Sequence, residues 1–169
     1  MTQRMPVLFI GRGSPLNMLE ENDYTRAISA LPDTFERPRA IVCVSSAYMT
    51  EGIMVMGDKK PRLIKDFYEF PDEVYSIKYP AQGDQELAQR VAELTGAQVD
   101  KSWGLDHGCW TVLYHLFPLA DIPIVELSVD PGSPYTGDFE RGGKLACLRD
   151  EGVLIVCSGG IVFNPHLIN

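Results

Sequence analysis

Short apolar segments that alternate with helical patterns constrain the fold of this chain more than any other feature. The strand-like segments, rich in Val, Ile and Leu as is typical of strands buried on both faces of a sheet, are residues 7–10, 40–46, 53–56, 123–129 and 153–157. The segments with apolar side chains at helical spacing are residues 23–31, 84–95, 110–117 and 137–149. Strands that alternate with helices predict an α/β layered fold, with a central, largely parallel sheet flanked by helices.

The composition predicts one globular domain over residues 1–169. A net charge of −8 argues against non-specific nucleic-acid binding and against attraction to anionic membranes. The sequence predicts neither a membrane span nor a signal peptide, because no apolar run has the required length and flanks. Four widely spaced cysteines without a CxxC pattern exclude a zinc ribbon, make a disulfide framework unexpected and favour a cytoplasmic location.

Residues 103–110 hold both tryptophans, two glycines and the adjacent Asp106 and His107. One interpretation is a rigid turn on which His107 is a general acid/base. Asp106 would then orient the imidazole, and the indole rings would keep water out. The alternative is a helix N-terminus, with Asp106 as the N-cap and an apolar helix face after it. Spacing alone favours the helix N-terminus.

Polar loops follow three of the predicted strands, at residues 11–15, 45–48 and 158–164. The carboxyl ends of parallel strands share one edge of a sheet, where α/β proteins bind ligands. Arg12 and Ser14 in the first loop could cradle an anion, although the loop matches no phosphate-binding motif and a plain turn is the alternative. Residues 57–80 mix basic and aromatic side chains. These could stack on a planar ligand, but they are more typical of a long loop held to the core by its rings.

The segments that match a known family extend over essentially the whole chain. They are residues 6–15, 40–45, 66–67, 79–80, 103–110, 120–128 and 144–152. In these segments the chain resembles the class III, LigB-type extradiol ring-cleavage dioxygenases, in particular the DOPA 4,5-dioxygenase-like branch. The resemblance implies cleavage of a catechol ring at an Fe(II) or Zn(II) ion, with His107 as the acid/base. The chain corresponds to the N-terminal two-thirds of such an enzyme.

The departures from the family pattern fall on the metal ligands. Arg12, Ala47 and Phe163 stand where the family has metal-binding histidines, and Lys65 and Lys78 replace two further histidines near the site. A divalent iron or zinc site needs about three imidazole or carboxylate donors. A guanidinium at ~4 Å from a dication would also cost roughly 8 kcal/mol at an effective dielectric constant of ~20. We therefore predict that the chain has no metal cofactor.

These observations leave several functional hypotheses open. The first is a degenerate family member that binds a small aromatic acid or serves as a partner subunit, with His107 and Asp106 as the surviving catalytic pair. The residues expected to line its pocket are Arg12, Ser14, Ala47, Lys65, Lys78 and Phe163. The second is an active dioxygenase completed by another chain that supplies metal ligands. The third is a metal-free activity that uses His107.

The end of the sequence also leads to an expectation about association. The last predicted strand, residues 153–157, lies close to the final residue, Asn169. In the family the C-terminal portion covers part of the sheet and adds to it, so here a strand edge or apolar surface should be left open. Such surfaces are rarely tolerated in monomers. We therefore expect a homo-oligomer or a partner chain at the surface next to residues 158–169.

Overall fold

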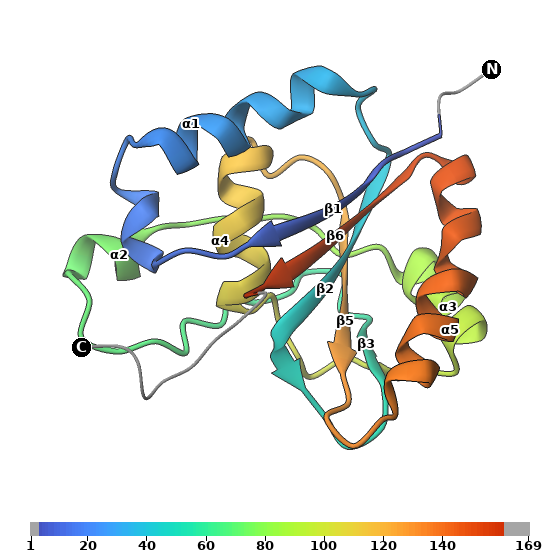
Figure 1. Ribbon diagram of the computed structural model, residues 1–169. Helices are drawn as coiled ribbons and strands as arrows, with labels where there is room; N and C mark the ends of the chain where they lie inside the picture. The colour runs from blue at the N-terminus through green and yellow to red at the C-terminus, as the bar shows by residue number, and fades with distance from the viewer. Residues whose placement is uncertain (1–3, 161–169) are drawn as a thin grey trace.

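A six-stranded sheet forms the centre of the computed structural model, which describes residues 4–160 (Figure 1). The strands lie in the order β1-β6-β2-β5-β3-β4. Their bounds are Val7–Gly11 for β1, Ala40–Met49 for β2, Met54–Met56 for β3, Gln98–Asp100 for β4, Ile124–Val129 for β5 and Val153–Gly159 for β6. Neighbouring strands are parallel, except that β3 runs antiparallel to β5. The predicted largely parallel sheet is confirmed.

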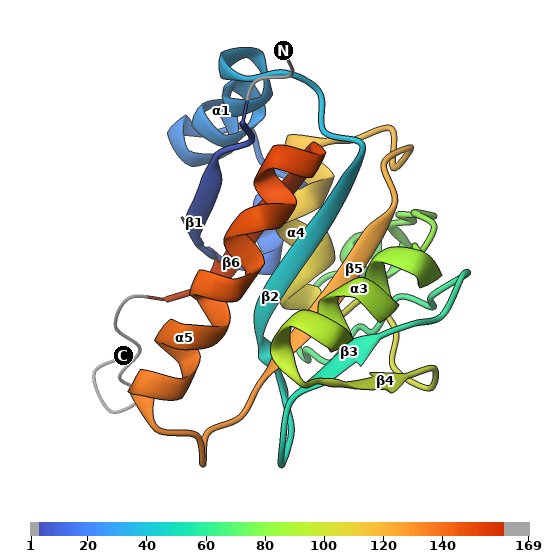
Figure 2. The same ribbon diagram turned by 90° about the vertical axis from the view of Figure 1, so that its right-hand side faces the viewer.

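Helices cover both faces of the sheet. The α-helices are α1 at Asp23–Ala30, α2 at Asp72–Ser76, α3 at Gln85–Thr95, α4 at His107–Leu116 and α5 at Tyr135–Leu145. Short 3-10 helices span Pro15–Met18, Leu31–Thr34 and Ala146–Glu151. Figure 2 shows α3 and α5 on one face and α4 on the other. Each face has its own apolar cluster, so the sheet is buried on both sides, as its Val- and Ile-rich strands require. No helix within residues 4–160 has the length and apolar character needed to cross a membrane.

The structure differs from the predicted elements mainly at their ends. The predicted helix over residues 110–117 begins earlier, at His107, with Asp106 as its N-cap, so the helix N-terminus was the correct interpretation of that segment. The predicted helix over residues 137–149 is α5 followed by a 3-10 helix, with Leu145 and Leu148 buried as expected. Helix α2 was not predicted, because its five residues are too few to show a periodic pattern.

Helix α4 is buried along most of its length and is held at its carboxyl end by a tyrosine. Trp110 and Leu113 are fully buried in the cluster that α4 shares with α1. The hydroxyl of Tyr79 donates to the carbonyl oxygens of Leu113, at 3.2 Å, and Phe117, at 3.0 Å. These carbonyls lie at the carboxyl end of α4, and each also accepts a backbone N–H, from Phe117 and from Ala120. The helix is thereby fixed in position, and its first turn can present side chains accurately.

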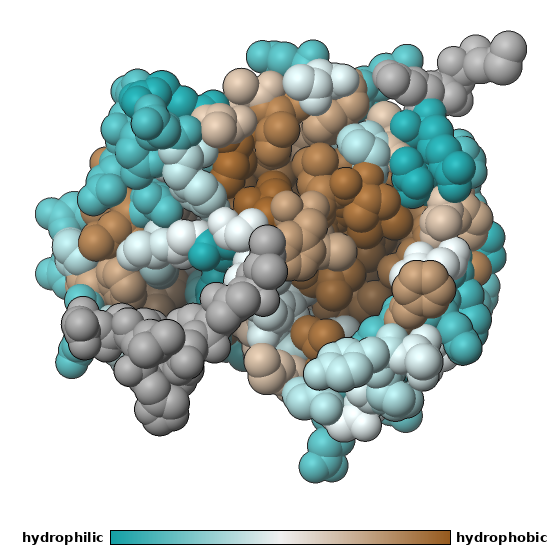
Figure 3. Space-filling view, in the orientation of Figure 1, coloured by the Kyte–Doolittle hydropathy of each residue, from teal (hydrophilic) through white to brown (hydrophobic). Residues whose placement is uncertain are grey.

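Strand β1 is an outer strand of the sheet. Within residues 4–160 it pairs only with β6, so its other edge has no strand partner there. Ile10 is buried against the α1 and α4 side, whereas Val7 and Phe9 on the opposite face are 49% and 58% exposed. Figure 3 shows an apolar surface between α1 and α5, where β1 and β6 lie. The α3 and α5 layer therefore does not extend over β1.

Candidate functional site

The carboxyl ends of β1 and β6 lie beside the middle of β2. Gly11 pairs with Gly159, and Ser158 pairs with Ser45. The expected loop at residues 45–48 is instead part of β2, which continues to Met49. The backbone N–H of Arg12 donates to the carbonyl of Gly159 at 3.0 Å and continues the β1–β6 ladder by one residue. The loop after β1 is therefore anchored to the end of β6.

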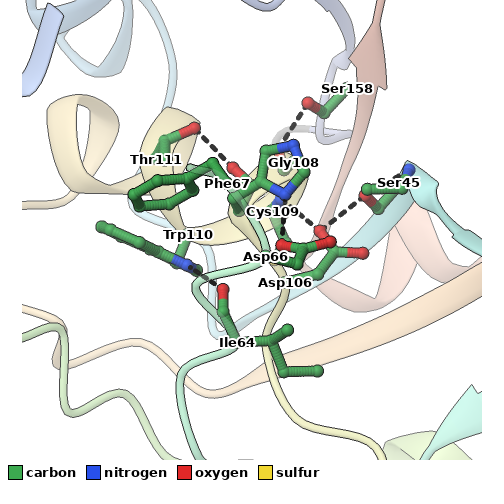
Figure 4. Close-up of polar contacts among 12 residues, drawn as sticks. Ser45, Ile64, Asp66, Phe67, Asp106, Gly108, Cys109, Trp110, Thr111 and Ser158 are labelled. Carbon is green, nitrogen blue, oxygen red and sulfur yellow. Dashed lines mark hydrogen bonds and ion pairs between the residues drawn. The ribbon is translucent and has the colours of Figure 1, made fainter. Parts of the chain in front are cut away.

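The first turn of α4 packs directly against these strand ends. The hydroxyl of Ser158 donates to the carbonyl of Gly108 (Figure 4). A Cβ on Gly108 would lie 2.4 Å from Ser45 Oγ and 3.5 Å from Ala47 Cβ, so only glycine allows this approach. Ala47 is thus beside the residue that follows His107.

Arg12 also lies near α4. It lines a small recess together with Thr111, one turn beyond His107. The structure therefore places Arg12 and Ala47 near the first turns of α4, the helix that begins at His107. The recess that Arg12 lines is lined by neither Ala47 nor His107, so their convergence in one pocket stays a prediction. Phe163, the fourth residue expected there, lies outside the described residues.

His107 is paired with a carboxylate that the sequence analysis did not select. Its Nδ1 is hydrogen-bonded to Asp66 Oδ1. The ring of Phe67 meets the imidazole edge to face, with centroids 5.9 Å apart. The His107 side chain is only 15% exposed, whereas that of Asp66 is 39% exposed. Since Asp66 and His107 are 41 residues apart, no local pattern joins them. The one available signal was that residues 66–67 match the family.

Asp106 has a different task from the one predicted for it. Its Oδ1 accepts from the N–H of Cys109 at 3.0 Å, which makes it the N-cap of α4, and from Ser45 Oγ at 2.7 Å (Figure 4). The residue is fully buried. Because the carboxylate turns back toward the first helical N–H groups, it does not reach His107 Nδ1. The expectation that Asp106 orients the imidazole is corrected: that contact comes from Asp66.

A second buried carboxyl group lies behind Asp106. Glu126, on β5, accepts from the backbone N–H of Asp106 at 3.1 Å and from Trp103 Nε1 at 3.4 Å. Burial, and then the nearby Asp106 carboxylate, raise the pKa of Glu126 well above its usual range. Asp106 Oδ2 is also buried, and no hydrogen-bond partner for it is found among residues 4–160. The raised pKa favours the neutral, protonated form of Glu126 in this buried position.

The remaining predicted pocket residues do not gather beside His107. The Lys65 ammonium donates to the carbonyl oxygens of Tyr75 and Ile77 and lies 5.9 Å from the Trp110 ring centroid. Burial lowers the pKa of Lys65. Its charge thus stabilises the carboxyl end of α2. Lys78 is exposed. The Ser14 hydroxyl accepts from a backbone N–H two residues later, which caps a 3-10 helix and agrees with the plain turn considered for that loop.

The described residues do not fit the metal site that the family implies. Arg12 and Ala47 offer no donor for a divalent cation, and the Nδ1 of His107 is engaged by Asp66. Within residues 4–160, no three side chains of His, Cys, Asp or Glu are arranged to hold a metal ion. A structural or catalytic zinc or iron site needs about three such donors. The edge that carries His107 has a histidine–aspartate pair and a guanidinium in place of such a set of donors.

Comparison with known proteins places this geometry in a family. Residues 12–167 match the family model described as the catalytic LigB subunit of aromatic ring-opening dioxygenase. The chain is 49% identical over 98% of its length to a protein of Escherichia coli K12 named 4,5-DOPA dioxygenase extradiol, and covers 62% of that protein. It is 37% identical to a protein of the same name from Portulaca grandiflora, of which it covers 63%.

A solved structure agrees with these matches. The crystal structure of an uncharacterized protein from Escherichia coli K12 superposes with a TM-score of 0.81 and 44% identity, over 98% of this chain and 64% of the other. The chain therefore spans less than two thirds of the length of these three proteins. The family-model match, the sequence identities and the shared fold lead to one conclusion: the chain belongs to the LigB family of extradiol ring-opening dioxygenases.

Proposed function

We propose that this chain is a degenerate member of the LigB family that does not cleave catechols and binds a small aromatic acid at the His107 edge. The observation that carries the proposal is the placement of Arg12 and Ala47 beside α4, at the positions where the family resemblance expects metal-binding histidines. Arg12 supplies a positive charge suited to a carboxylate. The aromatic side chains near His107, including Phe67, suit the ring of such a ligand.

The second candidate is a metal-dependent extradiol dioxygenase, acting on DOPA or another catechol, that another chain completes. Two observations favour it: the His107–Asp66 pair is intact, and the relatives named 4,5-DOPA dioxygenase extradiol are longer than this chain. Under this hypothesis the partner supplies the metal ligands. A metal-free reaction with His107 as acid/base is the third candidate, supported only by the same pair. Metal analysis of the purified protein separates the second candidate from the other two.

Replacement of Arg12 by Ala tests the proposed ligand site. Loss of a charge-assisted hydrogen bond should weaken binding of an aromatic acid by about 1–3 kcal/mol, which is roughly 5- to 150-fold in Kd. Isothermal titration calorimetry with benzoate, 4-hydroxyphenylacetate and DOPA measures this change. Arg26→Ala is the matched control, because Arg26 pairs with Glu21 and Asp23 on α1, in an exposed position. Equal weakening by both substitutions would show that net charge, not a site at Arg12, governs binding.

We also propose that the chain forms a homo-oligomer, or binds a partner chain, at the surface next to residues 158–169, of which residues 161–169 lie outside the described part of the chain. The support is β1, which pairs with β6 up to Gly159 and whose other edge has no strand partner among residues 4–160. The strand carries no charged residue, and Val7 and Phe9 are exposed on it. Two copies related by a twofold axis could pair these strands. Light scattering across a concentration series should show a dimer that Phe9→Lys dissociates, whereas Leu119→Lys, at a more exposed apolar position before β5, should leave it intact. A monomer at every concentration would refute this.

A cytoplasmic location is part of the same proposal. All four cysteines, Cys43, Cys109, Cys147 and Cys157, are free thiols. Free thiols are typical of proteins from a reducing compartment.

A further inference from the structure

The segment that carries Asp66 is fastened to the segment that carries His107. The N–H of Leu105 donates to the carbonyl of Arg62, and the N–H of Ile64 donates to the carbonyl of Leu105, each at 2.8 Å. The indole Nε1 of Trp110 donates to the carbonyl of Ile64 at 3.0 Å (Figure 4). Each of these contacts joins a residue close to Asp66 in the sequence to a residue close to His107. The carboxylate is therefore brought to the imidazole by a framework that does not depend on the pair itself.

The position of His107 is further restricted by its own helix. The hydroxyl of Thr111 donates to the carbonyl of His107, and the Phe67 ring lies against the imidazole. Only one ring nitrogen, Nδ1, faces Asp66. An ionised carboxylate can only accept hydrogen bonds, so Nδ1 must be the donor. In a neutral imidazole the second nitrogen, Nε2, is then the acceptor.

We propose that Asp66 is the positioning residue of this site: it holds neutral His107 in the tautomer with the proton on Nδ1, so that Nε2, on the ring edge away from Asp66, is available to accept a proton or hydrogen bond from a ligand. The inference deepens the proposed function, since it states what His107 offers to an aromatic acid. It does not depend on that function being correct, because the tautomer is a property of the unliganded chain. Asp66 acts through His107 and needs no contact with the ligand.

Nuclear magnetic resonance of histidine-labelled protein tests the proposal without any ligand. Long-range proton–nitrogen spectra distinguish the two neutral tautomers, and they should be recorded about two pH units above the ordinary histidine pKa of ~6.5. His107→Gln assigns the signals, because the chain contains only three histidines. The wild-type spectrum should show His107 with its proton on Nδ1. A wild-type His107 with its proton on Nε2, or exchanging between both tautomers, would overturn the proposal.

Substitution of Asp66 provides the second arm. Asp66→Ala should release His107 into a mixture of tautomers, and Asp66→Asn should favour the opposite tautomer, because the amide can donate to Nδ1. Asp72→Ala is the matched control: it removes an exposed carboxylate from the first turn of α2 and should leave the His107 spectrum unchanged. Persistence of the Nδ1–H tautomer in Asp66→Ala would also overturn the proposal. Failure of aromatic acids to bind would instead contradict the proposed function alone.

Discussion

Protein incubated with ferrous iron under anaerobic conditions and then desalted should retain far less than equimolar iron, and it should form no yellow ring-fission product from a catechol. The physical reason is the donor set: Arg12 and Ala47 provide no ligand beside His107, and a guanidinium repels a dication. Atomic emission measures the retained iron, and visible absorbance measures the product. The same experiment with zinc gives a redox-inactive comparison.

Restoration of histidines sharpens this prediction. Arg12→His alone should restore neither iron binding nor ring cleavage, because two further ligand positions of the family, Ala47 and Phe163, would still lack a donor. The triple variant Arg12→His, Ala47→His and Phe163→His should bind iron clearly more tightly than the single variant. Near-equimolar iron in the unmodified protein would contradict the proposed loss of the metal site and favour the metal-dependent enzyme.

Asp106→Ala should destabilise the fold by about 2–4 kcal/mol. Loss of the N-cap of α4 accounts for about 1 kcal/mol, and the buried Ser45 hydroxyl, left without its partner, adds about 1–3 kcal/mol. Urea denaturation measures the change in the free energy of unfolding. The prediction follows from the position of Asp106 as a buried structural group, which replaces its expected role beside His107.

Two variants serve as controls for Asp106→Ala. Asp84→Ala removes the N-cap of α3, where the carboxylate accepts from Leu87 N–H at 2.9 Å, but it leaves no buried hydroxyl unsatisfied, so it should cost only about 1 kcal/mol. Asp106→Asn keeps an oxygen for the cap and for Ser45, and should cost less than Asp106→Ala. Equal losses for Asp84→Ala and Asp106→Ala would mean that the buried contacts of Asp106 contribute little.

The layered fold could be predicted because its signal is local. The strands β2, β5 and β6 are mostly apolar and mostly buried, and β1 is an apolar run with one exposed face. Helix α3 has an apolar face between Asp84 as N-cap and Gly96 as C-cap. The approach of the end of β1, which Arg12 follows, to the end of β6 also followed from the sequence, since parallel strands place their carboxyl ends at one edge. These predictions needed only periodicity and the direction of the chain.

The rest of the site depends on contacts between distant segments. Residues 57–80 carry little periodic pattern, and their path is set by hydrogen bonds such as those of Ile64 with Leu105 and of Lys65 with Tyr75 and Ile77. For this reason the sequence did not reveal that Asp66 contacts His107. Nor did it reveal that the Lys65 ammonium donates to the carbonyls of Tyr75 and Ile77. Asp66, and not Asp106, contacts the imidazole of His107, because the Asp106 carboxylate points toward the N–H of Cys109 as the N-cap of α4.

The tight packing of α4 bears on how such a chain changes over generations. Asp106, Gly108 and Trp110 each make buried contacts that hold the helix against β2, β6 and the loop before α2. Replacement of any of them would impair folding, whatever the chain does. Arg12 follows the end of β1 and Ala47 lies in β2, and both are only half-buried, so replacement there should impair folding less. Mutation can therefore erase ligands for a cofactor while selection for a folded chain preserves the segment that surrounds His107.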